Sequence, residues 1–128
     1  MRTIIAGSRS IMDPNTVDAA LKWAQAVGLS ITQVVSGTAT GVDKLGELWA
    51  GYSGITVKRF RPDWDRYGKS AGFRRNAEMA AYAEALLAVW DGDSNGTRHM
   101  IDQAKARDLH VYVFNVKTDQ HEVTVPFL

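Results

Sequence analysis

Short apolar runs alternate along this chain with segments of helical periodicity, and this alternation limits the folds available to it. Five apolar runs are typical of strands, namely residues 4–6, 31–35, 55–57, 85–90 and 109–114. Four segments between or after them have apolar residues at helical spacing, namely residues 14–27, 42–52, 73–82 and a stretch around Met100 that ends near Asp108. Strands that alternate with helices form right-handed βαβ units around a parallel sheet. We therefore predict an α/β fold, a Rossmann-like three-layer sandwich with a mainly parallel sheet of about five strands.

The remaining segments are less regular. Asp13 followed by Pro14 is a good start for the first helix, because aspartate caps helices and proline suits their first turn. Residues 60–72 show no period, so we expect a long loop there. In the tail, residues 115–128, the segment 121–127 fits an edge strand, with Pro126 keeping it out of the sheet centre. We find no linker or repeat and expect residues 1–128 to form a single domain.

Composition excludes several classes of function. The chain has no cysteine, which rules out disulfides and thiolate chemistry, and its three histidines are widely spaced. We therefore expect no metal site, and no feature of the sequence calls for a cofactor. The formal net charge of +1 argues against a strongly electrostatic nucleic-acid binder. Because no apolar run has the length of a membrane span and the first residues do not resemble a signal peptide, we expect a cytoplasmic protein.

Three loops at the predicted carboxyl ends of strands carry residues suited to binding an anion. In an open parallel sheet, ligands bind beyond these ends, where helix N-termini present free N–H groups and glycine permits close approach. The candidate binding residues in these loops and directly after them are Gly7, Ser8, Arg9, Ser36, Gly37, Thr38, Thr40, Gly41, Asp43, Asp91, Gly92, Ser94, Gly96 and Thr97. The alternative is that the loops are ordinary strand-to-helix turns, and Thr40 with Asp43 also fits a capping box.

Two familiar phosphate-binding motifs are incomplete. Gly68, Lys69 and Ser70 resemble the end of a P-loop, but Asp63 stands where that motif needs its first glycine. Residues 37–41 do not form the G-x-G-x-x-G dinucleotide fingerprint. The sequence therefore predicts neither a standard ATPase nor a standard dehydrogenase.

The segment from Phe60 to Asn76 is rich in aromatic and cationic side chains. Trp64 or Tyr67 would be able to stack on a base, and Arg74 or Arg75 to pair with a phosphate. We include Trp64, Lys69, Arg75 and Asn76 among the candidate binding residues. The alternative is that Trp64 anchors the core and the arginines are only solvated.

The ordered set of these motifs resembles a known family. The set comprises residues 7–9, 35–43, 49–50, 62–64, 67–72, 75–76 with Met79, 90–92 and 96–97. Together they resemble the YspA/YpsA-related branch of the SLOG superfamily over roughly residues 2–114. Wider members of that superfamily include the Lonely Guy phosphoribohydrolases and the DNA-processing protein DprA. The resemblance implies a Rossmann-like fold, a nucleotide or nucleotide-derived ligand and a homo-oligomer.

The resemblance also bears on catalysis. Lonely Guy enzymes cleave the N-glycosidic bond of a nucleoside monophosphate with an arginine-to-methionine helix segment and a P-G-G-x-G-T-x-x-E motif. Residues 75–79 are similar to the first, so Arg75 would contact the phosphate or substrate. Gly96 and Thr97 match the second, which places Met100 at the glutamate position. The resemblance thus leaves Arg75, Asp43 and Asp91 as catalytic candidates, with Glu47 and Asp102 as further carboxylates.

Three hypotheses follow. The first is a protein that binds a nucleotide-derived phosphorylated ligand as a sensor or sequestering module, because the loops are intact and the hydrolase glutamate is missing. The second is a divergent phosphoribohydrolase. The third is DprA-like binding of single-stranded DNA through Lys69, Arg74, Arg75 and Trp64, although the near-neutral charge makes nucleic acid the least favoured partner.

Overall fold

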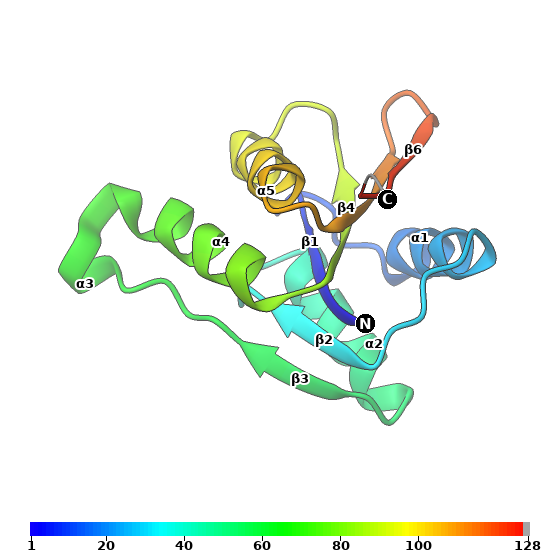
Figure 1. Ribbon diagram of the computed structural model, residues 1–128, viewed down its shortest axis with the longest axis horizontal. Helices are drawn as coiled ribbons and strands as arrows, with labels where there is room; N and C mark the ends of the chain where they lie inside the picture. The colour runs from blue at the N-terminus through cyan, green and yellow to red at the C-terminus, as the bar shows by residue number, and fades with distance from the viewer. Residues whose placement is uncertain (127–128) are drawn as a thin grey trace.

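A single mixed sheet forms the centre of the molecule (Figure 1). The computed structural model describes residues 1–126. The six strands lie in the order β3-β2-β1-β4-β5-β6, and all neighbours are parallel except β5 and β6. They are β1 (Arg2–Gly7), β2 (Gln33–Ser36), β3 (Thr56–Arg59), β4 (Ala85–Trp90), β5 (His110–Asn115) and β6 (His121–Thr124). The predicted α/β, Rossmann-like fold is therefore confirmed.

Four long helices cover the two faces of the sheet. These are α1 (Pro14–Ala26) and α2 (Val42–Tyr52) on one face, and α4 (Ala71–Tyr82) and α5 (Asn95–Ala106) on the other. A short helix α3 (Trp64–Tyr67) and a 3₁₀ turn η1 (Gly68–Ser70) precede α4 and extend away from the sheet (Figure 1). No helix within residues 1–126 has the length and apolar character needed to cross a membrane.

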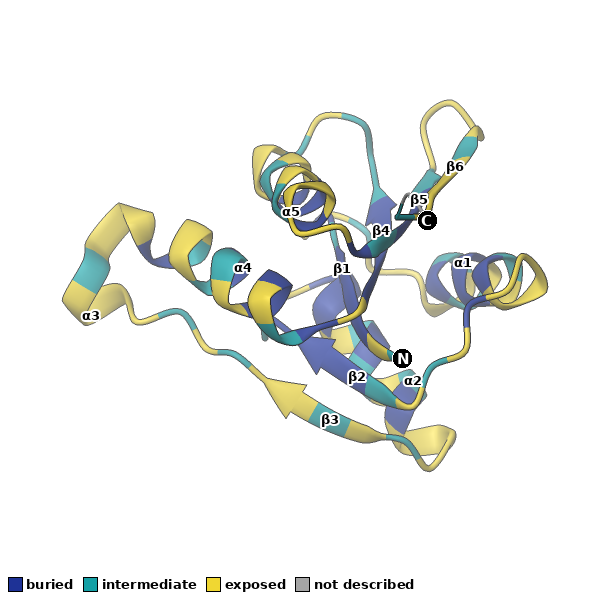
Figure 2. Cartoon of the chain, in the orientation of Figure 1, coloured by how far each residue is buried: buried dark blue, intermediate teal, exposed yellow. Residues whose placement is uncertain are grey.

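Alternation along the strands divides the core into two layers. Ile4 and Leu86 pack in the layer beneath α4 and α5, whereas their neighbours Ile5 and Leu87 pack beneath α1 and α2. All four are fully buried, because successive side chains of a strand point to opposite faces and helices cover both. Each such side chain contributes about 1.5–3 kcal/mol of hydrophobic stabilisation. Figure 2 shows that burial follows β1, β2 and β4, while β3 is mostly exposed.

Local signals explain where several elements begin. Asp13 caps α1, and its Oδ1 accepts from the Asn15 N–H at 2.9 Å, as the sequence predicts. The prediction of an irregular loop over residues 60–72 is wrong in part, since that segment contains α3 and η1. Helix α3 begins directly after Asp63, because Asp63 Oδ1 accepts from the Arg66 N–H at 3.1 Å and caps this single helical turn.

The tail adds a sixth strand to the five expected. Residues 121–124 pair antiparallel with β5 at the sheet edge, which fits the predicted edge strand. The His121 ring stacks on Phe114 with centroids 4.0 Å apart and holds β6 against β5. Phe127, the predicted end of this strand, lies outside the described residues.

The strand order creates a switch point between β1 and β4. From β1 the chain continues to β2 and β3 on one side, and β4 leads to β5 on the other. The loops that follow β1 and β4 therefore diverge and leave a crevice at their carboxyl ends, where ligands bind in sheets of this kind.

Gly7 is the point of closest approach between these two strands. A Cβ at Gly7 would lie 2.0 Å from the Val89 carbonyl oxygen and 2.7 Å from Val42 Cγ2. We expect Gly7→Ala to lower the free energy of unfolding by about 1–3 kcal/mol or more, since these neighbours cannot move without shifting β4 or α2. Chemical denaturation monitored by circular dichroism measures the change.

Gly51→Ala is the matched control. Gly51 lies in α2, and an added Cβ would meet nothing within 4 Å. This substitution should stabilise the protein by about 0.5–1 kcal/mol, because alanine favours a helix over glycine. Equal stability of the two variants would contradict the close packing at Gly7.

Candidate functional site

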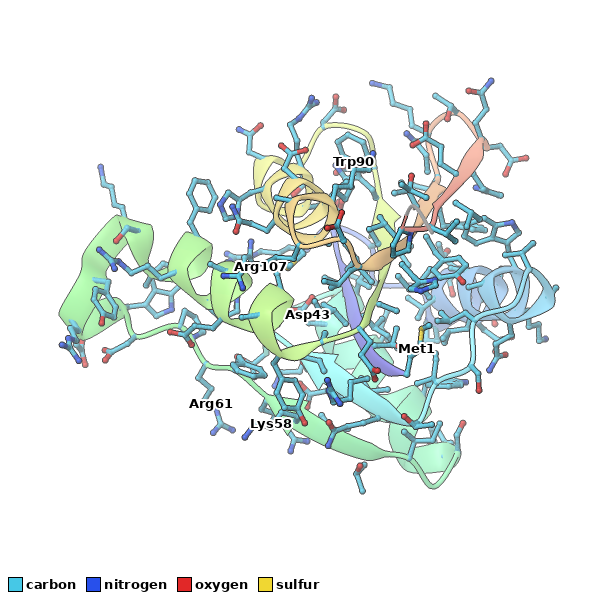
Figure 3. All side chains as sticks on the ribbon, in the orientation of Figure 1. Met1, Asp43, Lys58, Arg61, Trp90 and Arg107 are labelled. Atoms are coloured by element: carbon cyan, nitrogen blue, oxygen red, sulfur yellow. The ribbon has the colours of Figure 1, made fainter. Side chains whose placement is uncertain are left out.

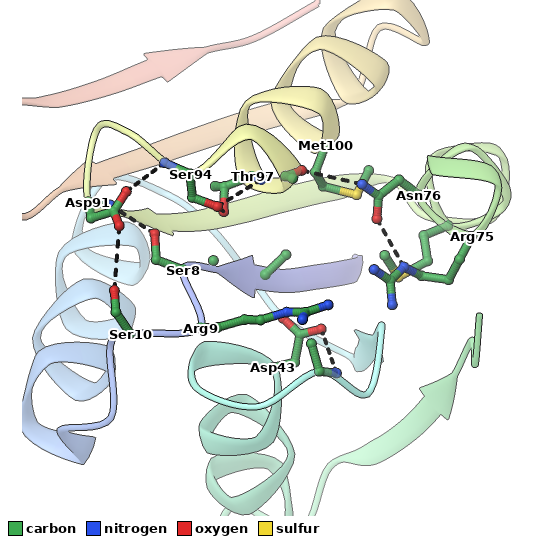
Figure 4. Close-up of a pocket in the computed structure, with 15 residues that line it drawn as sticks. Ser8, Arg9, Ser10, Asp43, Arg75, Asn76, Asp91, Ser94, Thr97 and Met100 are labelled. Atoms are coloured by element: carbon green, nitrogen blue, oxygen red, sulfur yellow. Dashed lines mark hydrogen bonds between the residues drawn. The ribbon is translucent and has the colours of Figure 1, made fainter. Parts of the chain in front are cut away.

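A cavity of about 390 Å³ opens at the carboxyl ends of β1 and β4 (Figure 4). Ten of the predicted site residues line it, namely Gly7, Ser8, Arg9, Asp43, Arg75, Asn76, Asp91, Ser94, Gly96 and Thr97. Ala6, Ser10, Ala39, Met79 and Met100 complete the lining. We call this space the first cavity.

Ser8 and Asp91 tie together the two loops of the switch point. The Asp91 N–H donates to Ser8 Oγ at 3.0 Å, and the Ser10 hydroxyl donates to Asp91 Oδ2 at 3.4 Å (Figure 4). The other carboxylate oxygen of Asp91 accepts from the N–H groups of Asp93 and Ser94, both at 2.8 Å. These two N–H groups hold the pKa of Asp91 below its ordinary value. The carboxylate thus shapes its loop, and a catalytic role for Asp91 stays a prediction.

Ser94 and Thr97 form the start of α5. Ser94 Oγ caps the helix by accepting from the Thr97 N–H at 3.5 Å and from the Thr97 hydroxyl at 3.2 Å. Both hydroxyl groups line the cavity but already have partners in this cap. The Thr97 hydroxyl hydrogen is used within the cap, whereas Ser94 Oγ only accepts there, so the helix N-terminus offers the cavity its partial positive charge and the Ser94 hydroxyl donor.

Arg75 and Asn76 link α4 to the loop after β2 and to the first turn of α5. Arg75 Nη1 donates to the Gly37 carbonyl oxygen, and its Nε donates to Asn76 Oδ1 at 3.0 Å. Asn76 Nδ2 donates in turn to the Gly96 carbonyl oxygen at 3.3 Å. A Cβ at Gly37 would lie 2.8 Å from Arg75 Nη1, so glycine lets the guanidinium rest against this backbone.

Asp43 is the buried carboxyl group of the cavity, with a relative exposure of 4%. The predicted capping box with Thr40 is wrong, because Gly41 is the N-cap of α2 and Asp43 Oδ2 accepts from the Ala39 N–H at 3.1 Å instead. Burial raises the pKa of Asp43 to about 6, against the opposing effects of the Ala39 N–H and the Arg75 charge. This carboxyl group is consequently poised to change protonation near neutral pH.

The glycine at the start of α2 explains why no capping box forms. Gly41 has a φ of 77°, a left-handed conformation, and an added Cβ would lie 2.7 Å from the carbonyl oxygens of both Ser8 and Arg9. The loop after β2 therefore packs directly on the loop after β1, which brings Asp43 into the first cavity.

A second cavity of about 290 Å³ adjoins the first. It is lined by Arg9, Gly37, Thr38, Ala39, Arg61, Pro62, Trp64 and Arg75, so that Arg9, Ala39 and Arg75 belong to both cavities. Trp64 is 51% exposed, which overturns the alternative that it anchors the core. Figure 4 shows Arg9 reaching across the first cavity toward Arg75.

The other predicted binding residues line neither cavity. They are Ser36, Thr40, Gly41, Lys69 and Gly92. Ser36 is buried and supports the loop, since its hydroxyl donates to Glu47 Oε2 at 2.6 Å and its Oγ accepts from the Thr38 N–H at 3.1 Å. Thr40 and Lys69 are exposed, and Gly92 has a φ of 85° in the turn after β4.

Sequence reasoning missed four residues that line the first cavity besides Met100, namely Ala6, Ser10, Ala39 and Met79. Ser10 closely follows Gly7, Ser8 and Arg9, so its position in a candidate loop was an available signal. The sequence identifies Met79 only as the end of the arginine-to-methionine segment and not as a binding residue. Met100, at the glutamate position of the hydrolase motif, does face the cavity and is 1% exposed. Among residues 1–126, no three histidine, aspartate or glutamate side chains gather as they would around a metal ion.

The raised pKa of Asp43 predicts how stability depends on pH. A carboxyl group with a higher pKa in the folded state binds more protons there, so its stabilising contribution is lost as pH rises from about 4 through about 6. Asp43→Asn removes this effect. We expect the free energy of unfolding of the variant to rise relative to that of the natural protein over this range. The full difference, reached above about pH 6, is on the order of 2–3 kcal/mol.

Urea denaturation between pH 4 and 8 measures this difference. Asp102→Asn, which removes an exposed carboxyl group from α5, is the control for loss of a charge. Parallel stability profiles for Asp43→Asn and the natural protein would show that Asp43 does not titrate in this range.

Comparisons with known proteins agree with the fold and the motifs. The chain is 37% identical over 123 residues to the Gene 61 protein of Mycobacterium phage D29, covering 91% of this chain and 98% of that protein. DNA processing protein A (DprA) of Streptococcus pneumoniae has a similar fold, with a TM-score of 0.67 at 16% identity. That match covers 88% of this chain and 49% of the DprA chain, so this chain spans about half the length of DprA. The model of the YspA, cpYpsA-related SLOG family matches residues 1–67, and the chain belongs to this family.

Proposed function

We propose that the protein binds a nucleotide or nucleotide-derived phosphorylated ligand in the first cavity and acts as a sensor or sequestering module. The observation that carries the proposal is the placement of Arg9 and Arg75 in one cavity wall. Burial lowers the pKa of Arg75; the Asp43 charge opposes this effect, and the Arg9 charge adds to it. Two guanidinium groups in the lining of one cavity favour an anion there, and arginine suits phosphate through paired N–H donors.

The Asp43 carboxyl group does not fully neutralise the positive charges of Arg9 and Arg75. Asp43 forms no ion pair with either arginine among the described residues, and burial favours its protonated form. An incoming phosphate would replace water around Arg9 and Arg75 and would favour the neutral form of Asp43 further. The start of α5, which also faces the cavity, adds a favourable dipole.

The rest of the cavity suits a sugar or a base. Ser10, Asn76 and Asp43 offer polar groups for hydroxyls, while Ala6, Met79 and Met100 offer an apolar surface. Membership of the SLOG family supports the assignment of a nucleotide-related ligand. The homo-oligomer and the cytoplasmic location expected from the sequence stay predictions.

Arg75→Ala tests this proposal. We expect the natural protein to gain thermal stability with at least one nucleoside phosphate or ADP-ribose-type compound, because a ligand that binds only the folded state stabilises it. The variant should bind the same compound at least tenfold more weakly, on the order of the 1.5–3 kcal/mol of a charge-assisted contact.

Titration calorimetry gives both affinities, and circular dichroism confirms that the variant is folded. Arg107→Ala is the matched control, since Arg107 is exposed and lines neither cavity. Absence of a stability shift across mono-, di-, tri- and cyclic nucleotides would contradict nucleotide binding.

A second candidate function is hydrolysis of the N-glycosidic bond of a nucleoside monophosphate, and the buried Asp43 supports it. A carboxyl group with a pKa near 6 inside a cavity is suited to general acid–base work at neutral pH. In its ionised form it would also stabilise the positive charge that develops on the ribose. Met100 supplies no carboxylate at the position used by Lonely Guy enzymes, so this role would fall to Asp43.

Incubation with nucleoside monophosphates tests hydrolysis directly. The activity predicts release of free base detected by chromatography, with release reduced at least a hundredfold in Asp43→Asn, as for loss of a general acid or base. Asp102→Asn should retain the activity. Failure to release base from every common monophosphate would exclude the hydrolase function while leaving binding untouched.

A further inference from the structure

The two adjoining cavities differ in the charge of their walls. The first cavity contains Arg9 and Arg75 together with the carboxyl groups of Asp43 and Asp91. The second contains Arg9, Arg75 and Arg61 and no acidic side chain. Arg9, Ala39 and Arg75 line both cavities and form their shared wall. Negative charge on a ligand is therefore favoured at this shared wall and in the second cavity rather than deep in the first cavity.

Arg61 differs from the arginine two positions before it. Arg59 Nε donates to Glu47 Oε1 at 2.9 Å, so its charge is paired. Arg61 is exposed and has no side-chain hydrogen bond or ion pair within residues 1–126, where it lies on the segment that joins β3 to α3 (Figure 3). A long unpaired side chain at the edge of a cavity is able to turn toward an anion bound there.

The remaining wall of the second cavity is rigid backbone and ring surface. Trp64 and Arg75 both lie against Gly72, where a Cβ would be in ordinary contact with Trp64 Cη2 at 3.6 Å and with Arg75 Nη2 at 3.8 Å. Thr38 opposite them has a left-handed φ of 67° and is held by its N–H bond to Ser36 Oγ. Most of the lining of the second cavity therefore comes from residues other than Arg61.

We infer that the second cavity is a subsite for a further phosphate, so that the ligand is a nucleoside diphosphate or a diphosphate-linked derivative rather than a monophosphate. This inference rests on the proposed function. The phosphate nearest the sugar would lie at the shared wall between Arg9 and Arg75. The next phosphate would lie in the second cavity, where Arg61 closes on it as a specificity-determining residue.

Matched pairs of nucleotides test this inference by titration calorimetry in buffer containing EDTA. The probes are AMP and ADP, GMP and GDP, CMP and CDP, and UMP and UDP. For the base that the protein recognises, the diphosphate should bind the natural protein about tenfold more tightly, as expected for added charge-assisted contacts. Arg61→Ala should reduce this preference to about twofold or less while leaving the monophosphate affinity within about twofold.

Lys58→Ala is the matched control. Lys58 lies on β3 close to Arg61 in the chain, is exposed and lines neither cavity, so its removal lowers the net charge equally and should preserve the preference. Equal binding of mono- and diphosphate by the natural protein would overturn the subsite and leave the proposed function standing. An equal loss for both nucleotides in Arg61→Ala would also overturn it. If none of the eight nucleotides binds, the diphosphate subsite is overturned, whereas the proposed function is decided by the wider panel that includes cyclic nucleotides and ADP-ribose-type compounds.

Discussion

The close contact between the ends of β1 and β4 determines how this site is built. The Ser8 N–H donates to the Val89 carbonyl oxygen at 3.1 Å, and Ser8 Oγ accepts from the Asp91 N–H, so pairing continues beyond the strands into both loops. Gly7 permits the approach because a side chain there would collide with the backbone of β4. The loops consequently leave the sheet side by side and then diverge, which opens the first cavity between them.

The loop after β2 completes the site by a second close contact. Gly41 rests on the carbonyl oxygens of Ser8 and Arg9, and Gly37 rests against the Arg75 guanidinium. Three segments distant in sequence are thereby fixed with almost no side-chain bulk between them. The Ala39 N–H holds Asp43, the Gly37 carbonyl oxygen and Asn76 Oδ1 hold Arg75, and no ion pair within 4.0 Å joins Asp43 to Arg75. Their charges are therefore available to a ligand.

Much of the fold followed from periodicity, because most strands are buried on both faces and most helices have one apolar face. The run 85–90 coincides with β4, and Asp13 with Pro14 predicted the start of α1. The segment 60–72 was harder, because a single turn capped by Asp63 has no periodic apolar face to reveal it. Likewise, a capping box at Thr40 was a reasonable local prediction that the packing of Gly41 against β1 overrides.

Part of the site was equally predictable. The rule that ligands bind beyond the carboxyl ends of parallel strands identified the three loops, and most of their residues do line a cavity. Spacing gave no means of deciding which hydroxyls face a ligand and which support a loop. Ser36 and Ser94 have the same chemistry, yet Ser36 is fully buried against Glu47 while Ser94 faces the cavity. That difference depends on the second turn of α2, which brings Glu47 back beside Ser36, and the spacing of loop residues does not reveal this contact.

The two candidate functions make opposite demands on Asp43. A phosphate between Arg9 and Arg75 is repelled by an ionised Asp43, so binding favours the protonated carboxyl group and raises its pKa further. Hydrolysis of a glycosidic bond instead needs negative charge beside the ribose as the bond breaks. In a hydrolase the substrate would have to hold its phosphate far enough from Asp43 for the carboxylate to ionise. Met100 supplies no carboxylate, and the Asp91 carboxylate already accepts from the Asp93 and Ser94 N–H groups of its own loop. Asp43 would therefore have to satisfy both conditions, and for this reason we favour binding over cleavage.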